Sequence, residues 1–346
     1  MAMADVTVRG AGIFGLSVAH ACAARGARVR VIDPAGPGGG ASGGLVGALA
    51  PHVPENWNPK KAFQLHSLLI AEDFWSEVAA TGGRDPGYAR TGRLQPVADD
   101  AALELARARA RSAADLWQGQ ADWRLLRSEE AGTGLIPLSP SGWLILDTLS
   151  ARLHPRKACA ALAAAITARG GQIVTDGPEE GRVLHATGVA DLTRIAAARG
   201  PSAAAGVKGQ AALLQADFGQ APQVFAAGVH VVPHGDGTVA IGSTSERSFD
   251  DPDTTDEQLD AVIALARAHV PALAEAPVIA RWAGLRPRAP SRAPILGAHP
   301  LHPGHFIANG GFKIGFGMAP GVAQVMADLM LDGRDAIPEG FRAPPL

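Results

Sequence analysis

The chain has 346 residues, of which 47% are hydrophobic and 18% are charged, and its formal net charge is −2. This length allows two domains, or one elaborate domain, with a substantial core. No stretch of about 20 residues is apolar throughout and no basic run occurs, so we expect neither a membrane span nor nucleic acid as the main partner.

The N-terminal segment carries the most informative pattern. Val6–Asp33 reads as a strand, a glycine turn, a helix, a second strand and an acidic residue. In such a turn Gly10 permits the tight bend, Gly12 admits a pyrophosphate at the positive end of the helix, and Gly15 lets the helix pack on the sheet. Asp33 is placed to accept hydrogen bonds from ribose hydroxyls. The pattern predicts a dinucleotide site.

A loop rich in glycine and proline follows, from Pro34 to Gly44, and continues into the segment 45–52. Low complexity is one interpretation of this composition. Because glycine lets the backbone approach phosphate closely, we favour a second cofactor loop.

Hydrophobic periodicity and turn residues predict the remaining elements. A helix after residue 250 is expected to start with a capping box formed by Thr254 and Glu257. The other predicted elements are helices over 62–80, 101–117, 155–170 and 320–333, strands over 92–97, 142–147, 182–188, 280–284 and 305–308, and a hairpin over 229–242.

This order predicts an α/β fold in which a Rossmann-type domain with a parallel sheet is interrupted twice by antiparallel segments. Residues 1–85, 146–210 and 290–346 are expected to form the dinucleotide-binding domain. Residues 86–145 and 211–289 are expected to form an antiparallel-sheet substrate domain.

Several segments together carry a family resemblance. They are Gly10–Gly15, Gly40–Pro51, Ala280–Gly297 and Asn309–Pro320, with the weaker pieces Gly206–Gln210 and Val232–Glu246 in the same order. With them the chain resembles the flavin-dependent D-amino acid oxidase-like oxidoreductases, closest in motifs to bacterial glycine oxidases and amino acid dehydrogenases. The resemblance spans nearly the whole chain.

The resemblance implies non-covalent FAD. A C-terminal cysteine attachment is excluded because no cysteine follows Cys159, while His52 stays open as an attachment point. The Gly310–Gly315 turn would donate backbone N–H groups to the flavin N1/O2 edge, with a helix opening near Pro320 behind it. The implied cofactor-binding residues are Gly10, Gly12, Ile13, Phe14, Gly15, Asp33, Ala41, Ser42, Gly43, Gly47, Ala48, Leu49, Thr187, Gly188, Gly310, Gly311, Phe312, Lys313, Ile314 and Gly315.

The resemblance also implies substrate contacts. Arg286 matches the family arginine that clamps the substrate carboxylate, although a surface arginine in a basic loop is the plainer interpretation. Lys313 takes the place of a second arginine and could contact a carboxylate, the flavin or a water. His230 lies where relatives often have a tyrosine; a solvated strand position is its alternative. His52 completes the implied set.

The implied reaction is oxidation of the C–N bond of a small amino acid, including D-amino acids, or of an N-alkyl amino acid. Hydride passes to flavin N5, the imine is hydrolysed, and electrons pass to O2 or another acceptor. Two alternatives stay open. One is a flavoenzyme that modifies the wobble uridine of tRNA, and the other is the FAD-binding subunit of a heteromeric amine dehydrogenase. A homo-oligomer also stays open.

The two cysteines, Cys22 and Cys159, both fall on predicted Ala-rich helices. They are too few for a disulfide framework or a metal site, so we expect no metal. The first strand begins close to Met1 without a signal peptide before it, and we therefore expect the cytoplasm as the compartment.

Overall fold

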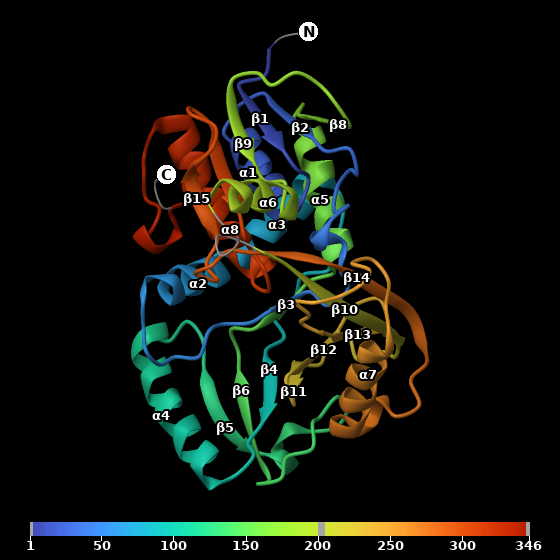
Figure 1. Cartoon of the computed structure of the whole chain (residues 1–346). Helices are drawn as coiled ribbons and strands as arrows, with labels where there is room; N and C mark the ends of the chain where they lie inside the picture. The colour runs from blue at the N-terminus through green and yellow to red at the C-terminus, as the bar shows by residue number, and fades with distance from the viewer. Residues whose placement is uncertain (1–2, 200–204, 344–346) are drawn as a thin grey trace.

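The computed structural model contains two large sheets, stacked one above the other in Figure 1. It describes residues 3–199 and 205–343. Residues 1–2, 200–204 and 344–346, which the sequence assigns to the dinucleotide-binding domain, lie outside the described residues. In the part of the chain that the structure describes, no helix is both long and apolar enough to cross a membrane.

The upper sheet is the predicted parallel one. Its order is β15 (Ile295–Ala298), β16 (Phe306–Asn309), β9 (Arg182–His185), β1 (Val6–Arg9), β2 (Val29–Ile32) and β8 (Gln172–Val174). All neighbours pair in parallel except β15, which pairs antiparallel with β16. Val8 in β1 is fully buried between Val31 and Leu184, as expected for a central strand covered on both faces.

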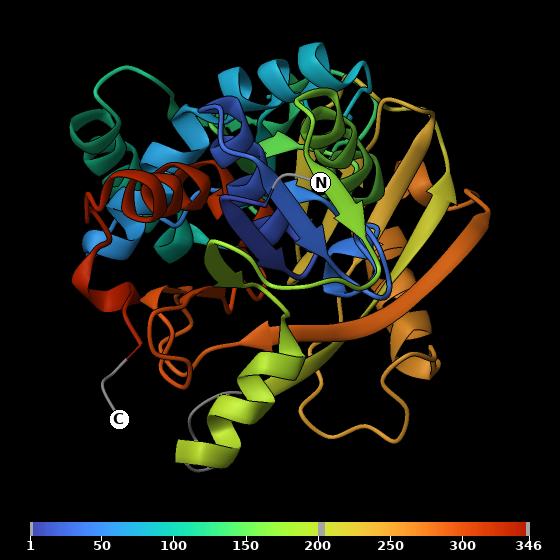
Figure 2. The same ribbon diagram turned by 90° about the horizontal axis from the view of Figure 1, so that it is seen from above.

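Helices cover this sheet (Figure 2). α1 (Ile13–Ala24), α5 (Pro155–Ala168) and α8 (Gly315–Ala327) contact its strands, and α2 (Pro59–Leu69) and α3 (Ala71–Gly82) pack on these helices. α6 (Val189–Arg199) lies against the second large sheet. The core helix α1 packs against α8 and α5, and α3 packs against α5. α1 is buried almost all round, which explains why its sequence is apolar on every face.

The lower sheet has eight strands and is antiparallel except for one pair. Its order is β14 (Val278–Arg288), β10 (Ala205–Gln215), β13 (Thr238–Gly242), β12 (Val229–Pro233), β11 (Gln223–Ala226), β4 (Arg93–Pro96), β6 (Trp143–Asp147) and β5 (Trp123–Arg127). The parallel pair is β11 with β4. The helices α4 (Asp100–Trp117) and α7 (Glu257–His269) pack on it, and β3 (Ala48–Leu49) pairs with β7 (Ala151–Arg152) beside it.

The last long helix begins earlier than the sequence predicts. α8 starts at Gly315, so Pro320 lies inside the helix rather than at its first turn. Proline has no N–H to donate, and the amide of the next residue, Gly321, donates to Ser67 Oγ of α2 at 3.0 Å. Packing against α2 thus stabilises a helix with an internal proline. The glycines and the proline in its sequence would not by themselves predict a helix there.

Two further predictions are corrected. The helix expected over 62–80 is two helices, α2 and α3, separated at Ile70. The capping box of Thr254 and Glu257 is wrong, because Asp256 is the N-cap of α7 and its carboxylate accepts from Gln258 N at 3.0 Å.

We propose that the domains divide along the two sheets. The predicted boundaries at 146 and 210 run through β6 and β10, and both strands belong to the eight-stranded sheet along their whole length. On the proposed division these strands join the substrate domain, and the rest of the predicted arrangement is kept.

Candidate active site

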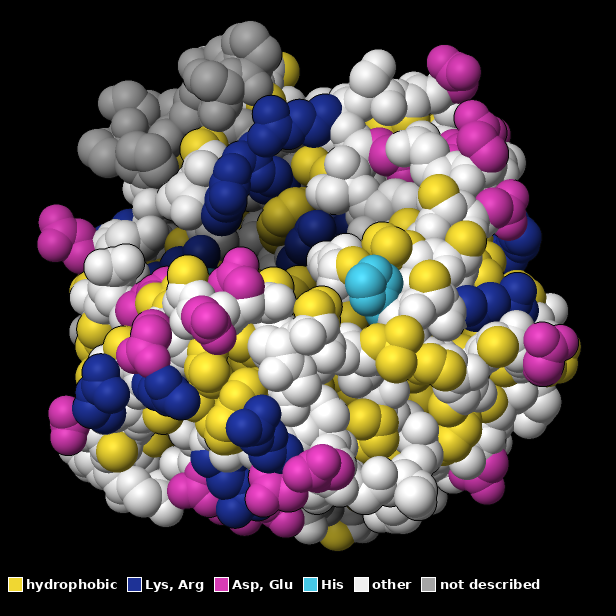
Figure 3. All heavy atoms as spheres, turned by 90° about the horizontal axis from the view of Figure 1, so that it is seen from below, with side chains coloured by type: hydrophobic (Ala, Val, Ile, Leu, Met, Phe, Trp, Pro, Cys, Tyr) yellow, Lys and Arg dark blue, Asp and Glu magenta, His cyan; other side chains and the backbone are white. Residues whose placement is uncertain are grey.

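A cavity of about 1000 Å³ lies where the two sheets meet and is lined by residues from both. This volume is at the upper end of the range for cofactor and ligand sites, roughly 300–1,000 Å³. Figure 3 shows a hollow in one face of the molecule, with Lys and Arg side chains at its rim and within it. The charged residues that line the cavity are Arg9, Arg93, Arg194, Arg286, Lys313, Asp33 and Asp253.

The glycine turn between β1 and α1 forms one wall. Gly10 has a φ of +104°, and a Cβ there would lie 2.4 Å from the Ala186 carbonyl oxygen. A Cβ on Gly15 would lie 1.9 Å from the Gly10 carbonyl oxygen, so Gly15 shapes the turn without lining the cavity. Gly12 does line the cavity and is the N-cap of α1. The backbone is therefore exposed to a ligand at the positive end of this helix.

Two side chains hold this turn in place. Ser42 Oγ accepts from the amide of Ile13 at 2.9 Å. The Asp33 carboxylate accepts from the amides of Ala11 at 2.7 Å and Ala35 at 2.9 Å, and Asp33 also faces the cavity. A carboxylate can accept about four hydrogen bonds, so Asp33 keeps capacity for ribose hydroxyls.

The loop over 41–49 supplies the neighbouring wall. Ala41, Ser42, Gly47, Ala48 and Leu49 line the cavity, as Ile13 and Phe14 do. Gly43 does not; a Cβ there would lie 2.4 Å from the Gly38 carbonyl oxygen, which indicates a role in folding the loop.

The turn after β9 carries an unsatisfied polar group. Thr187 and Gly188 line the cavity, and the buried hydroxyl of Thr187 has no hydrogen-bond partner among the described residues. A buried hydroxyl is normally paired, so this atom indicates a polar ligand. With the exposed turn of α1 and the excess of basic residues, it fits the phosphates and ribose of a dinucleotide.

The C-terminal turn lines the cavity beside the start of α1, since a Cβ on Gly311 would lie 2.9 Å from Phe14 Cζ. Gly310, Gly311, Phe312, Lys313, Ile314 and Gly315 all line it. Gly310 and Phe312 have positive φ values of 76° and 44°, and Phe312 N donates to the Pro287 carbonyl at 3.1 Å. Because α8 begins at Gly315, its unpaired first-turn N–H groups start directly at the cavity wall.

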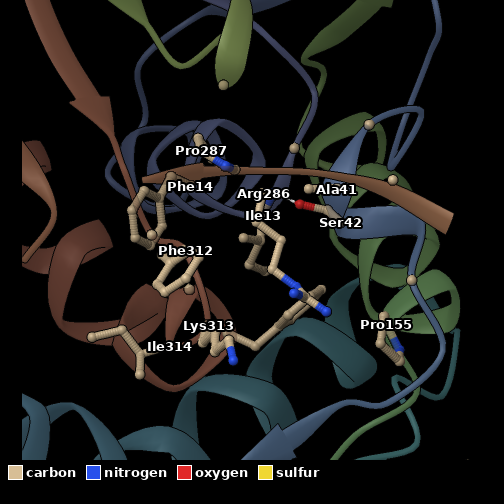
Figure 4. Close-up of a pocket in the computed structure, with 18 of the residues that line it drawn as sticks. Ile13, Phe14, Ala41, Ser42, Pro155, Arg286, Pro287, Phe312, Lys313 and Ile314 are labelled. Carbon is tan, nitrogen blue, oxygen red and sulfur yellow. Dashed lines mark hydrogen bonds between the residues drawn. The ribbon is translucent and has the colours of Figure 1, made fainter. Parts of the chain in front are cut away.

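Arg286 projects from β14 into the cavity (Figure 4). Its Nη1 donates to the Thr244 carbonyl at 3.0 Å and its Nη2 donates to Ser243 Oγ at 2.6 Å. The guanidinium lies against Gly209, where a Cβ would be 2.0 Å from Cζ. Burial lowers the pKa of Arg286 to about 10, so the side chain stays cationic at neutral pH.

A buried polar network supports the segment that holds Arg286. Glu246 accepts from the Thr244 hydroxyl and from Gln210 Nε2, the latter at 3.0 Å. Lys208 Nζ lies 3.7 Å from Glu246 and 3.2 Å from Asp256. These contacts fix the strand end that carries the acceptors of Arg286.

Lys313 points into the same part of the cavity as Arg286 (Figure 4). It forms no ion pair with a carboxylate in the part of the chain that the structure describes. Burial first and the Arg286 charge second lower the pKa of Lys313. The two cations thus repel each other across the cavity.

His230, from β12, also lines the cavity, and its Nδ1 is buried without a hydrogen-bond partner among the described residues. Burial first, then the charges of Arg93 and Lys313, lower the pKa of His230 to about 3. The ring is therefore neutral at physiological pH, and its centroid lies 4.6 Å from that of Phe225.

His52 lies on the cavity wall and is held by Gln64, whose Oε1 contacts both its Nδ1 and its backbone amide. Burial lowers the pKa of His52.

Sequence reasoning missed Arg93. This residue is buried, lines the cavity and donates from Nε to Asp147 at 2.9 Å. Both residues sit on predicted strands, but their pairing depends on β4 and β6 lying side by side. The pairing of these two strands cannot be predicted from the spacing of nearby residues in the sequence.

The geometry defines a class of protein: an α/β dinucleotide-binding protein with a cation-lined cavity beside the glycine turn. The chain belongs to the DAO family of FAD-dependent oxidoreductases, whose family model matches residues 5–329. It is therefore an FAD-dependent oxidoreductase.

Three similar proteins illustrate the relationship. The glycine oxidase of Pseudomonas putida is 28% identical over 376 residues, covering 98% of each chain. The crystal structure of glycine oxidase from Geobacillus kaustophilus matches with a TM-score of 0.83 and 22% identity over 99% of this chain and 98% of that one. Iminodiacetate oxidase from Chelativorans sp. BNC1 matches with a TM-score of 0.82 and 23% identity over 97% of this chain and 98% of that one.

Proposed function

We propose that this protein oxidises the C–N bond of a small amino acid or N-alkyl amino acid with a free carboxylate. The observation that carries the proposal is the pair of cations, Arg286 and Lys313, directed into one part of the cavity, where neither forms an ion pair with a carboxylate of the described residues. A substrate carboxylate would neutralise them. Arg286 uses two of its five N–H donors within the protein, which leaves three to bind the carboxylate.

The cofactor would be held without a covalent bond. Neither cysteine lines the cavity, and burial raises the pKa of Cys159 to about 12. His52 is engaged by Gln64. We assign the phosphates and ribose to Gly12, Asp33 and Thr187, and the flavin ring to the turn from Gly310 to Gly315.

Bound FAD supplies a hydride acceptor at N5 and the carrier that returns electrons to O2 or another acceptor. The chain's own residues would orient the substrate so that its C–H bond faces that position. Arg286 would fix the carboxylate in a bidentate manner, and Lys313 would add a point charge. No residue need act as a general base, and His230, with a pKa of about 3, is a poor proton acceptor at neutral pH.

A substrate panel tests this function. The FAD-loaded protein is mixed anaerobically with glycine, sarcosine, iminodiacetate and small D-amino acids, and bleaching of the flavin absorbance is followed. Methylamine and dimethylamine serve as matched amines without a carboxylate. We expect bleaching with at least one acid and far slower bleaching with its matched amine. Equal bleaching by both would contradict the carboxylate site, and bleaching by none would contradict the function.

A further inference from the structure

Four histidine rings form a cluster outside the cavity. The ring centroid of His185 lies 4.6 Å from that of His299, 4.8 Å from that of His302 and 5.3 Å from that of His305. His185 Nε2 and His305 Nδ1 are 3.0 Å apart. Ring nitrogens of His185, His299 and His302 all lie within 4.8 Å of one another.

Three chain segments assemble this cluster. The loop from β15 to β16 reads His-Pro-Leu-His-Pro-Gly-His and contributes a histidine at every third position, 299, 302 and 305. His185 ends β9, and it is brought to the loop because β16 pairs with β9 at Ile307 and His185. The N-terminal turn of α6 adds Asp191. Only the fold brings the loop to His185, since 120 positions separate His185 from His305.

Asp191 gives the cluster a buried carboxylate that pairs with His299. The residue is fully buried, and its Oδ2 lies 3.0 Å from His299 Nε2. Its Oδ1 is buried without a hydrogen-bond partner among the described residues, and Arg194 Nη1 lies 3.9 Å from it. A buried carboxylate oxygen left in this state is costly unless a positive charge lies nearby.

We propose that His185, His299 and His302 bind one divalent transition-metal ion such as Zn²⁺, with Asp191 as its buried counter-charge. Imidazole ligands suit Zn²⁺, Ni²⁺ and Cu²⁺, whereas Mg²⁺ and Ca²⁺ prefer oxygen ligands. A carboxylate hydrogen-bonded to a histidine commonly accompanies such ligands.

Binding requires a modest contraction of the cluster. Zinc–nitrogen bonds of about 2.0–2.1 Å place tetrahedral ligand atoms roughly 3.4 Å apart. His299 already uses both ring nitrogens, since Nδ1 accepts from the amides of Leu301 and His302 at 3.0 and 3.1 Å. The ion would replace the contacts of one of these nitrogens, and the loop would close around it.

A metal ion at this site would stabilise the folded structure and would take no part in the redox chemistry. His185 immediately precedes the turn that carries Thr187 and Gly188, and Asn309 Nδ2 donates to the Gly188 carbonyl at 2.9 Å. An ion here would join β9 to the β15–β16 loop, with α6 held through Asp191, directly behind the turn that we assign to the ADP half of the cofactor. Metal-dependent thermal stability is the expected signature.

The test uses untagged, full-length, FAD-loaded protein that has been treated with a chelator and exchanged into metal-free buffer. Zn²⁺ is titrated by calorimetry at pH 7.5, with Mg²⁺ as the negative control, and bound metal is counted by elemental analysis. We expect one Zn²⁺ per chain and a higher thermal midpoint, since Zn²⁺ at 100 times its Kd favours the folded state about a hundredfold.

Variants separate this site from other histidines. His302→Ala, at a half-buried position, and His299→Gln should each lower Zn²⁺ affinity at least tenfold, while His66→Ala, on the exposed side of α2, should leave it unchanged. Unaltered flavin absorbance shows that a variant is folded. Absence of stoichiometric Zn²⁺ binding by the parent protein, or the same affinity in His302→Ala, would overturn the proposal and leave a cluster held by hydrogen bonds alone.

Discussion

The two walls of the cavity present different chemistry. The wall made by the glycine turn, the β9 turn and the start of α8 offers mainly backbone, with N–H groups and glycines at Gly10, Gly12 and Gly310. The opposite wall, on β12 and β14, offers side chains, chiefly His230 and Arg286. A backbone wall can be altered only by steric change, whereas a side-chain wall can be altered by charge. The two walls should therefore respond differently to substitution.

The largest effect is expected at Gly10. In Gly10→Ala the new Cβ would meet the Ala186 carbonyl at 2.4 Å at a φ of +104°, so the turn must shift and FAD content should fall at least tenfold. Gly26→Ala is the matched control, because Gly26 has a φ of +85° but nothing within 4 Å. It should cost about 1 kcal/mol of stability and retain FAD. Equal FAD loss in both would contradict the steric argument.

Arg286→Ala should weaken substrate binding at the side-chain wall without changing FAD binding at the backbone wall. Loss of a charge-assisted contact of about 1.5–3 kcal/mol should raise the apparent substrate Kd tenfold or more, with little change in the flavin spectrum. Arg281→Ala, on the same strand but paired with Asp260 in solvent, is the control and should leave the Kd unchanged. Anaerobic titration of flavin reduction measures both. An unchanged substrate Kd in Arg286→Ala would contradict the assignment of Arg286 to the substrate carboxylate.

Gly209→Ala tests whether the space left by a glycine is needed to position the Arg286 side chain. Its Cβ would lie 2.0 Å from the Arg286 guanidinium, which must move off its contacts with Ser243 and Thr244. We expect a severalfold rise in substrate Kd that is not additive with Arg286→Ala, because both changes act on one interaction. Additive losses in the double variant would show that Gly209 acts independently of Arg286.

Lys313 lies where the two walls meet. The variant Lys313→Met tests whether this side chain binds the substrate carboxylate or contacts the flavin. If it binds the carboxylate, the substrate Kd should rise severalfold, by less than in Arg286→Ala, because lysine lacks a bidentate fork. If it faces the flavin, reoxidation should slow while anaerobic reduction stays nearly normal. Rapid mixing resolves the two half-reactions. An unchanged variant in both would leave Lys313 without a functional role.

The last expected effect is a pH dependence of stability. His230 has a folded-state pKa of about 3, below its ordinary value of 6.5, so the unfolded chain binds the proton more readily. Its contribution to stability is present above pH 6.5 and is lost as the pH falls toward 3, by at most about 1.4 kcal/mol per pH unit. His230→Gln should flatten the pH profile between 6.5 and 4.5, measured by urea unfolding. A profile with the same slope in both proteins would contradict this origin.

The sequence predicted the backbone wall more fully than the side-chain wall. The turn formed by Gly10, Gly12 and Gly15 could be predicted because few other residues can occupy such a turn, and their spacing is local. Arg93 was missed because its contact with Asp147 exists only once β4 and β6 pair. The contact of the Arg286 guanidinium with Gly209 likewise depends on the pairing of β10 with β14.

The start of α8 could not be predicted for a related reason. A proline inside a glycine-rich segment indicates a helix start there, and only the contact of Gly321 with Ser67 on another helix stabilises the earlier start. The histidine cluster shows the same limitation, because the regular spacing of His299, His302 and His305 is visible in the sequence while the approach of His185 is not.

The strand β14 links the two walls mechanically. It carries Arg286, and directly beyond that residue it meets the cofactor turn, where Pro287 accepts from Phe312 N and Arg288 forms a bridge with Gly311. A rotation of one sheet against the other would therefore carry Arg286 and the Gly310–Gly315 turn together. If the proposed function holds, the distance between a bound carboxylate and the flavin would be set by three adjacent residues of one strand, and it would be kept when the two sheets move.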